Sequence, residues 1–210
     1  MMNAITQEFI RLNVVFVVPE NIVDTAIALS NKLGGRDDAY FTLGKNQCQP
    51  HITLYAPEYP ESARNEVLKV VDGVTAHWST IQCRIVGANS GQGYIGLEVE
   101  KTPEIQQLHE ECVFRLNPLR EGRLREKYAQ DYRMQFSDEK IKNIETYGYP
   151  NAMSLYHPHL TVIRLKDEQR APDVAQTIQW TYAFNVTALA VYEMGDHGTC
   201  QKLIKEFQLH

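Results

Sequence analysis

The sequence has no excess of basic residues, which a protein that coats long nucleic acid would need. Of its 210 residues, 21 are Lys or Arg and 26 are Asp or Glu, which gives a formal net charge of −5. Binding along extended nucleic acid usually depends on a strong basic patch that neutralises phosphates. Net charge does not describe a local pocket, however, so a small anionic substrate is still allowed.

Paired cysteines and long apolar runs are also absent. Cys48, Cys83, Cys112 and Cys200 include no CxxC pair, so we expect reduced and mostly buried thiols in a reducing compartment. The apolar run at 14–18 is far too short to cross a bilayer, and the first ten residues lack the basic start and apolar core of a secretion signal. We therefore expect a cytoplasmic protein without membrane contact.

The sequence does contain enough apolar residues for a core, because 43% of all its residues are hydrophobic and 22% are charged. Short valine-rich and alternating segments predict strands, and glycine and proline signals mark the ends of helices. The expected strands are 12–19, 51–55, 81–86, 94–99, 159–165, 182–192 and 199–209. The expected helices are 20–33, 61–71, 103–116 and 172–178.

The order of these elements repeats. Each half of the chain has a strand containing His-x-Thr, then a helix, then two strands joined by a turn that contains glycine. This order predicts an α+β fold of two pseudo-symmetric lobes, with mostly antiparallel sheets facing a central cleft and helices on the outside. We interpret residues 1–210 as a single two-lobed domain, since the length suits neither one minimal domain nor two ordinary ones.

The segment 117–152 fits the repeat least well. It is rich in tyrosine and in charge, with basic and acidic residues nearly in balance. We favour a solvated helical insertion here. The alternative is a lid or substrate-facing flap that carries Tyr128, Tyr132 or Tyr147.

The strongest functional signal is a repeated Pro-His-x-Thr motif, in PHITLY at 50–55 and in PHLTVI at 158–163. Residues i and i+2 of a strand share a face, so His51 is expected beside Thr53 and His159 beside Thr161. Related lobes would bring the two pairs together across a cleft. One copy alone is a common accident, because threonine favours strands anyway. Two copies with matching flanks are much harder to obtain by chance.

Two opposed histidines suit the cleavage of a phosphodiester without a metal ion. Histidine titrates near neutral pH, so one imidazole can accept a proton from the attacking water or hydroxyl while the other donates one to the departing oxygen. Threonine hydroxyls can donate to the non-bridging oxygens, which gain charge in the transition state. No serine or cysteine is placed beside a base, so we expect no protein nucleophile.

By these motifs the chain resembles the 2H phosphoesterase superfamily, whose defining feature is two H-x-T/S motifs in two lobes. The resemblance implies that His51 and His159 form the acid–base pair and that Thr53 and Thr161 bind phosphate. It also implies hydrolysis of a cyclic or 2′-5′ phosphodiester in a nucleotide or short RNA end, most often of a 2′,3′-cyclic phosphate to a 2′-phosphate, with no cofactor.

Two further residues are candidates for substrate binding. The second motif, HLTVIRLKD at 159–167, is similar to the family pattern and so includes Arg164, although simple alternation directs Arg164 away from His159. It would then act from the strand end or support the motif structurally. Tyr55 shares the expected face of His51, and could either contact a base or phosphate or pack at the strand end. The first motif continues as YAPEYP, unlike the RNA ligase-like branch, which leaves the substrate open.

Other histidines offer weaker alternatives. His157 and His159 could suggest a metal pair, but zinc needs further ligands and none is suitably spaced, so we expect no metal. We expect His109 to be exposed or half-buried on its helix, and His197 to lie in a turn that could contact substrate. The loop ANSGQG at 88–93 lacks the GK[ST] of a phosphate loop and is interpreted as a turn.

Two other functions compete with hydrolysis. One is the joining of RNA 2′-5′ ends, and the other is a non-catalytic module that binds nucleotides or RNA in the same cleft. A pure binding module has no need for two proton-transfer groups, which argues against it. We expect a monomer that takes a small nucleotide or an RNA end as substrate and has no protein partner.

Overall fold

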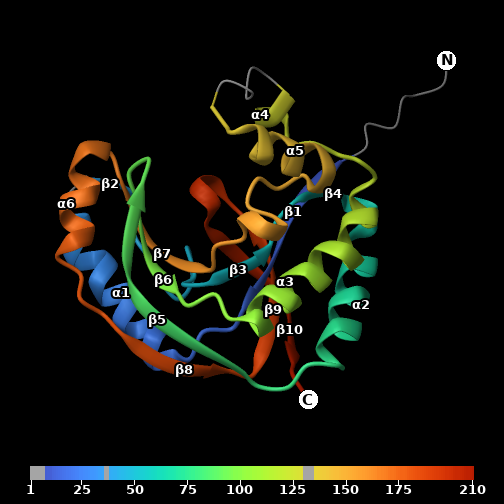
Figure 1. Ribbon diagram of the computed structural model, residues 1–210, viewed down its shortest axis with the longest axis horizontal. Coiled ribbons are helices and arrows are strands. Elements are labelled where there is room, and N and C mark those ends of the chain that lie inside the picture. The colour runs from blue at the N-terminus through green and yellow to red at the C-terminus, as the bar shows by residue number, and fades with distance from the viewer. Residues whose placement is uncertain (1–7, 36–37, 130–134) are drawn as a thin grey trace.

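The computed structural model describes residues 8–35, 38–129 and 135–210, in which one antiparallel sheet is flanked by helices (Figure 1). The strands are β1 Phe9–Phe16, β2 Ala39–Phe41, β3 Ile52–Tyr55, β4 Glu58–Pro60, β5 Ile81–Gly91, β6 Tyr94–Val99, β7 His159–Leu165, β8 Tyr182–Val186, β9 Ala188–Met194 and β10 Cys200–Gln208. The helices are α1 Glu20–Gly34, α2 Arg64–Thr75, α3 Pro103–Leu116, α4 Glu126–Ala129, α5 Asp138–Tyr147 and α6 Ala171–Gln176.

The pairing between neighbouring strands is least extensive at the centre of the sheet. Its order is β10-β9-β1-β3-β7-β6-β5-β8, with β4 beside β1 and β2 beside β7. The two motif strands, β3 and β7, are joined by one residue pair, Ile52 with Leu160. We call β1, β3, β4, β9 and β10 the first lobe, and β2, β5, β6, β7 and β8 the second lobe. The predicted α+β fold, with antiparallel sheets in two similar lobes, is confirmed.

Each lobe combines strands from both halves of the chain. The first motif strand, β3, shares its lobe with the C-terminal strands β9 and β10, whereas β7 shares its lobe with β5 and β6. Helix α2 packs against β9 and β10, and α6 packs against β5 and β6. Helix α1 lies against β7, and α3 lies against β3. The lobes therefore do not correspond to the two halves of the sequence repeat.

One predicted strand is in fact two. The expected strand 182–192 is interrupted at Thr187, because β8 pairs with β5 of the second lobe while β9 pairs with β1 and β10 of the first. Its continuous apolar pattern gave no sign of this interruption, since both pieces are strands. The chain crosses from one lobe to the other at this point.

The hairpin of β5 and β6 is longer than expected. Strand β5 continues to Gly91, so the predicted turn 88–93 shrinks to Gln92 and Gly93, with φ of 51° and 79°. A side chain at Gly93 would place its Cβ 2.6 Å from the carbonyl oxygen of Leu165, so glycine is required there for space as well as for φ. The longer hairpin carries its tip to the space between the lobes.

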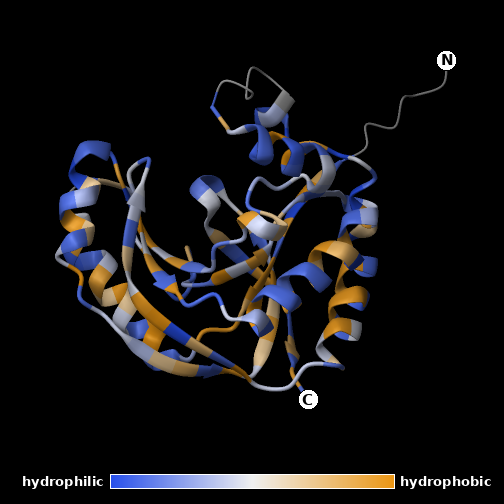
Figure 2. Ribbon diagram, viewed as in Figure 1, coloured by the Kyte–Doolittle hydropathy of each residue, from blue (hydrophilic) through white to orange (hydrophobic). Residues whose placement is uncertain are grey.

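The core lies between the sheet and the helices. Leu12, Phe16, Ile52 and Leu160 are fully buried, and Figure 2 shows hydrophobic residues gathered along the strands and on the helices that flank them. Burying such a side chain contributes about 1.5–3 kcal/mol. All four cysteines are buried and free of disulfides, which agrees with the expected buried thiols.

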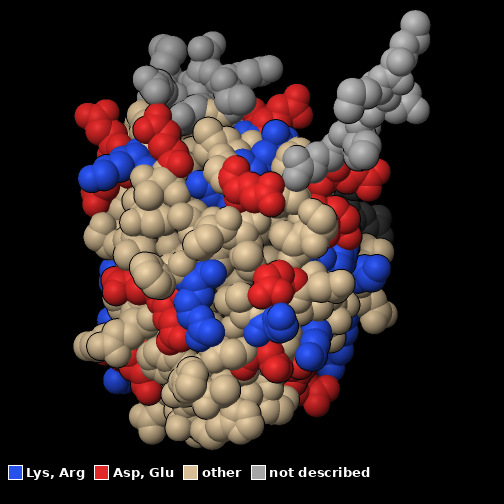
Figure 3. Space-filling view, turned by 90° about the vertical axis from the view of Figure 1, so that its right-hand side faces the viewer, with Lys and Arg blue, Asp and Glu red and all other residues tan. Residues whose placement is uncertain are grey.

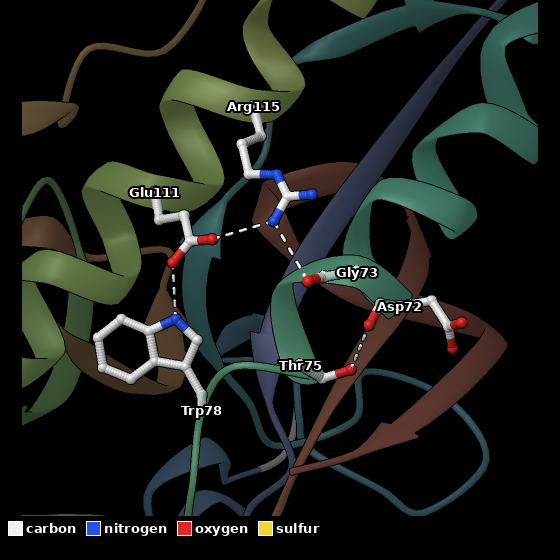
Figure 4. Close-up of polar contacts among 6 residues, drawn as sticks. All are labelled: Asp72, Gly73, Thr75, Trp78, Glu111 and Arg115. Atoms are coloured by element: carbon white, nitrogen blue, oxygen red, sulfur yellow. Dashed lines mark hydrogen bonds and ion pairs between the residues drawn. The ribbon is translucent and has the colours of Figure 1, made fainter. Parts of the chain in front are cut away.

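Helices α2 and α3 are tied together on the outside of the first lobe (Figure 4). The Arg115 guanidinium donates to the Glu111 carboxylate at 3.0 Å and to the Gly73 carbonyl at 3.2 Å. Glu111 also accepts from the indole nitrogen of Trp78 at 2.7 Å. Because α3 lies against β3, these contacts help to hold the scaffold behind the first motif.

The outer surface shows no single-sign charge on the face seen in Figure 3. Basic and acidic side chains are intermixed there, on the side that forms the right-hand edge of Figure 1. Among the described residues, no helix is both long enough and apolar enough to cross a membrane.

Candidate active site

The predicted histidines and threonines meet in one cleft between the lobes. The cleft has a volume of about 1080 Å³, and His51, Thr53, His159 and Thr161 all line it. Residues of the β5–β6 hairpin tip, the turn 194–198 and the segment 117–152 complete its walls. The structure thus brings both motifs to the same space, as their repetition suggested.

Both histidines are held in the same way. The Nδ1 atom of His51 lies 2.7 Å from the carbonyl oxygen of Gln49, and that of His159 lies 2.8 Å from the carbonyl oxygen of His157. A carbonyl oxygen only accepts, so each Nδ1 must carry the hydrogen. In the neutral imidazole this leaves Nε2 without a proton and able to act as a base. Each ring is therefore fixed in one tautomer by the backbone two residues before it.

The two histidines differ in their surroundings. His51 is only 9% exposed, and burial lowers its pKa to about 4, with additional lowering from His159 and Arg11. His159 is half-buried. Burial also lowers the pKa of His159; the hydrogen bond to the His157 carbonyl raises it, the His157 imidazole lowers it, and the Glu98 carboxylate raises it by the least of these effects. His51 is thus the more deeply buried of the two imidazoles, and burial disfavours the protonated form.

Thr53 has an oriented hydroxyl. Its Oγ1 accepts a hydrogen bond from the side-chain Nδ2 of Asn13 at 2.9 Å, which leaves the hydroxyl hydrogen available for a ligand. Asn13 is fully buried, and two residues before it on β1 lies Arg11, which shares its face and also lines the cleft. Thr161 lies opposite Gly96 of β6, where a side chain would crowd Asn89 at 3.1 Å.

Arg164 lines the cleft, contrary to the prediction from simple alternation. Strand β7 contains a bulge: Ile163 pairs with Ile95 and Thr161 with Gly96, so Val162 has no partner on β6. A bulge adds one residue and reverses the alternation that follows it. Arg164 therefore returns to the face of His159 and Thr161.

The Arg164 guanidinium is surrounded by aromatic rings and polar partners. Its Cζ lies 4.9 Å from the ring centre of Tyr40 and 4.7 Å from that of Tyr94. Its Nη1 is 3.0 Å from Nδ1 of His197, and because arginine only donates, this Nδ1 must be the acceptor. Glu168 forms an ion pair with Nη2 at 3.4 Å. These contacts hold the guanidinium at the edge of the cleft.

Tyr55 does not line the cleft, so the prediction that it lies on the same strand face as His51 is wrong. The cause is a second bulge, because Tyr55 pairs with Val14 and Thr53 with Val15, which leaves Leu54 without a partner on β1. Tyr55 is fully buried and its hydroxyl donates to the carbonyl of Tyr147 at 2.6 Å. Its role is to anchor the segment 117–152 to β3.

His109 is also placed differently from the prediction, since it is fully buried. Its Nδ1 lies 2.7 Å from the Leu54 carbonyl, its Nε2 accepts from the Met153 amide at 2.8 Å, and its ring stacks on Tyr156. This arrangement requires a neutral ring, and burial lowers its pKa to about 4. His109 joins α3 to the first motif strand.

Within the described ranges, no group of three or more His, Cys, Asp or Glu side chains is arranged to hold a metal ion. His157 lies at the cleft with its Nε2 3.4 Å from the Glu98 carboxylate. His197, in the turn before β10, also lines the cleft.

The sequence reasoning missed the charge of the cleft. Among the described residues, five basic side chains line it, against one acidic residue, Asp196. The basic residues are Arg11, Arg125, Lys127, Lys140 and Arg164. Arg11 was not considered because the predicted strand began after it. The available signal was its place two residues before Asn13, because residues i and i+2 of a strand share a face. Tyr128 of the segment 117–152 also lines the cleft, Tyr147 does not, and Tyr132 lies outside the described residues.

Comparison with known proteins gives one family and several similar folds. A family model described as the 2'-5' RNA ligase superfamily matches residues 32–198. E. coli LigT complexed with 3'-AMP is 14% identical with a TM-score of 0.61, covering 96% of this chain and 99% of that one. TT0787 of Thermus thermophilus is 17% identical with a TM-score of 0.62, covering 95% and 97%. The PDE domain of MHV ns2 is 11% identical with a TM-score of 0.54, covering 89% and 99%. No curated protein matches the chain in sequence. At these identities the solved structures show a shared fold.

Proposed function

The chain belongs to the 2'-5' RNA ligase superfamily, and from that premise we propose that it is a metal-independent phosphodiesterase acting on a nucleotide or a short RNA end. The observation that carries the proposal is the convergence of two His/Thr pairs, built in the same way, on one cleft. We propose that the bond it cleaves in the substrate is a cyclic or 2′-5′ phosphodiester, and that the main reaction opens a 2′,3′-cyclic phosphate to a 2′-phosphate.

Both proton transfers of that reaction, and the charge that develops on the phosphate oxygens, have a matching side chain in the cleft. A water oxygen attacks phosphorus, and the bond between phosphorus and the 3′ oxygen breaks. One imidazole accepts the proton that the water loses, and the other donates a proton to the departing 3′ oxygen. The hydroxyls of Thr53 and Thr161 donate to the non-bridging oxygens as their charge grows. Arg164 adds a positive charge at the edge of the cleft. The two imidazoles can supply both proton transfers by themselves.

The electrostatics favour His51 as the base and His159 as the acid in the hydrolytic direction. The burial that keeps His51 neutral leaves its Nε2 ready to accept a proton from water. His159 is more exposed than His51 and will be protonated more readily when an anionic phosphate enters the cleft. In the reverse reaction the same two groups exchange these roles.

Similar structures support a nucleotide as the ligand. LigT has been crystallised in complexes with NADP+, 3'-AMP, phosphate and ATP. We propose that the cleft of this chain likewise accepts a nucleotide.

The test is hydrolysis in the presence of a chelator. The protein is incubated with 2′,3′-cyclic nucleotides, 2′-5′ oligoadenylate and cyclic dinucleotides, and His51→Ala and His159→Ala are compared with the exposed-site control His77→Ala. Loss of about 10²–10⁴-fold in kcat in both motif variants, with the control unaffected, is expected. Loss of activity with chelator contradicts the metal-independent mechanism. Tight binding without turnover would indicate a binding module, and joining of RNA ends would indicate a ligase.

A further inference from the structure

We propose that the cleft contains a second phosphate subsite, formed by Arg11, Arg125 and Lys127, so that the preferred substrate carries another phosphate group beside the one that is cleaved. This inference rests on the proposed function and adds to it the charge and minimum size of the substrate. It separates substrates with two or more phosphates from mononucleoside cyclic phosphates.

The first support is the balance of charge. The chain carries a net charge of −5, yet the described residues that line the cleft include five basic side chains and one acidic one. A single phosphodiester carries one negative charge. The two histidines, the two threonines and Arg164 already suffice to bind it. Four of the basic side chains are left without a function in the cleavage step, and three of these, Arg11, Arg125 and Lys127, form the proposed subsite.

The second support is the state of Arg11. Its Nε is buried, and in the described part of the chain it has no hydrogen-bond partner. The acidic residue opposite it in register, Glu58, is engaged elsewhere, because its carboxylate accepts from Arg123 at 2.9 Å. A buried donor without a partner destabilises the folded protein. A phosphate oxygen would satisfy this donor.

The third support is the crowding of cations above Arg11. Lys127 and Arg125 extend from α4 and the residues just before it, and both line the cleft. Burial together with Arg125, Arg11 and Arg164 lowers the pKa of Lys127 to about 8. Within the described ranges none of Arg11, Arg125 and Lys127 forms an ion pair. Mutual repulsion of this kind is relieved when an anion binds between the cations.

Tyr128 adds a flat surface beside these charges. The Lys127 ammonium lies 4.8 Å and the Arg125 guanidinium 5.5 Å from the centre of its ring. The arrangement of cations next to an aromatic ring suits a nucleotide, whose phosphate meets the charges while its base can stack. The substrate class that fits is a short oligonucleotide that ends in a cyclic phosphate, with an internucleotide phosphate in this subsite.

The experiment uses two dinucleotides that differ in one non-bridging group of the internucleotide linkage and therefore in charge. Both end in a 2′,3′-cyclic phosphate, but one has an ordinary phosphate linkage and the other a neutral methylphosphonate linkage. We expect the wild-type protein to prefer the charged dinucleotide by about tenfold or more in kcat/KM, as the loss of one charge-assisted contact predicts. In the double variant Arg125→Gln, Lys127→Gln this ratio should fall towards one. The control Lys142→Gln, which changes an exposed lysine on α5, should keep it.

A wild-type ratio near one, or a ratio that the double variant preserves, would overturn the subsite. Binding of both dinucleotides to the His159→Ala protein, measured by calorimetry, provides a readout that needs no turnover. If none of the cyclic phosphates is hydrolysed but the charged dinucleotide still binds about tenfold more tightly, the proposed reaction fails while the subsite stands. If hydrolysis proceeds with equal binding of the two, the subsite fails while the reaction stands.

Discussion

The two motif strands share a bulge at the same place and differ in their surroundings. β3 and β7 each place a histidine and a threonine in the cleft and then bulge after the threonine. In both, the fifth residue after the histidine therefore lines the cleft, and this residue is Ala56 in the first lobe and Arg164 in the second. The two motifs thus share the histidine and the threonine and differ at the fifth position.

The difference continues around each motif. The first lobe, without an arginine at the fifth position, has Arg11 on the neighbouring strand and Asn13 holding the threonine hydroxyl. The second lobe has Arg164 between two tyrosine rings, and Glu98 close to its histidine. The fold thus repeats the histidine–threonine pair in both lobes, whereas the side chains around each pair differ.

Among the changes that test this difference between the lobes, the largest effect should come from Arg164, the arginine that the first lobe lacks. Arg164→Ala is expected to reduce kcat/KM by about 100-fold. The variant loses a contact between arginine and phosphate that contributes several kcal/mol at most, and water that fills the space makes up part of this loss. Arg164→Lys should recover only part of the loss, since lysine cannot reproduce the planar fork. The control is Arg170→Ala, an exposed residue paired with Asp38. Equal activity of Arg164→Ala and wild type would show that the two lobes do not differ in this way.

The next effect concerns stability and the burial of His51. Its folded pKa of about 4 lies below the ordinary value of 6.5, so the unfolded chain binds more protons between these values. Folding therefore gains stability from the neutral, buried His51. This stabilisation is complete above pH 6.5 and is lost as the pH falls towards 4, so the free energy of unfolding should fall by about 2 kcal/mol between pH 7 and pH 5. Urea unfolding at the two pH values measures it. His51→Gln should reduce the fall by that amount, and His157→Gln, at an exposed site, should not. An unchanged fall in His51→Gln would mean that His51 is not buried as a neutral ring.

A smaller effect is expected at the hydrogen bond to Thr53. Asn13→Ala leaves the hydroxyl free to rotate, and we expect kcat to fall about tenfold with little change in KM, as for the loss of one hydrogen bond used in the transition state. Thr53→Val should be at least as harmful. If Asn13→Ala changes only the unfolding free energy, then Asn13 supports the fold and does not orient the hydroxyl.

The smallest effect should come from His197, which contacts Arg164 and not the motif. His197→Ala removes the acceptor for Nη1 and the ring beside Tyr40, so we expect KM to rise about threefold while kcat is retained. In an Arg164→Ala background the same change should have no further effect, because the two residues would act together. Additive losses in the double variant would separate His197 from Arg164.

The sequence was informative where local pattern decides the structure. The Pro-His-x-Thr repeat predicted both pairs and their meeting, and the helices α1 and α3 have nearly the expected bounds. It failed where one residue changes the register. Neither bulge can be recognised from Leu54 or Val162, which look like ordinary strand residues, and each bulge reversed the predicted face of the residue that followed.

Long-range pairing was the second limit. Nothing local at Thr187 indicates that the chain leaves one lobe for the other, because both sides of this residue read as strand. The cationic character of the cleft was hidden for a similar reason. Arg11, Arg125 and Arg164 are far apart in sequence and lie in segments whose total charge is unremarkable, so their meeting depends on the fold.

The exchange of strands between lobes has a consequence for how the protein is made. A ribosome that has released the first half of the chain has exposed β3 and its histidine, but not β9 and β10, which complete that lobe. Neither lobe can form as an independent early unit, since each waits for residues near the C-terminus. Contacts between such distant residues slow folding and favour a concerted final step. Cutting the chain between the motifs would therefore yield two fragments that each lack strands of both lobes, and activity would return only when the fragments associate.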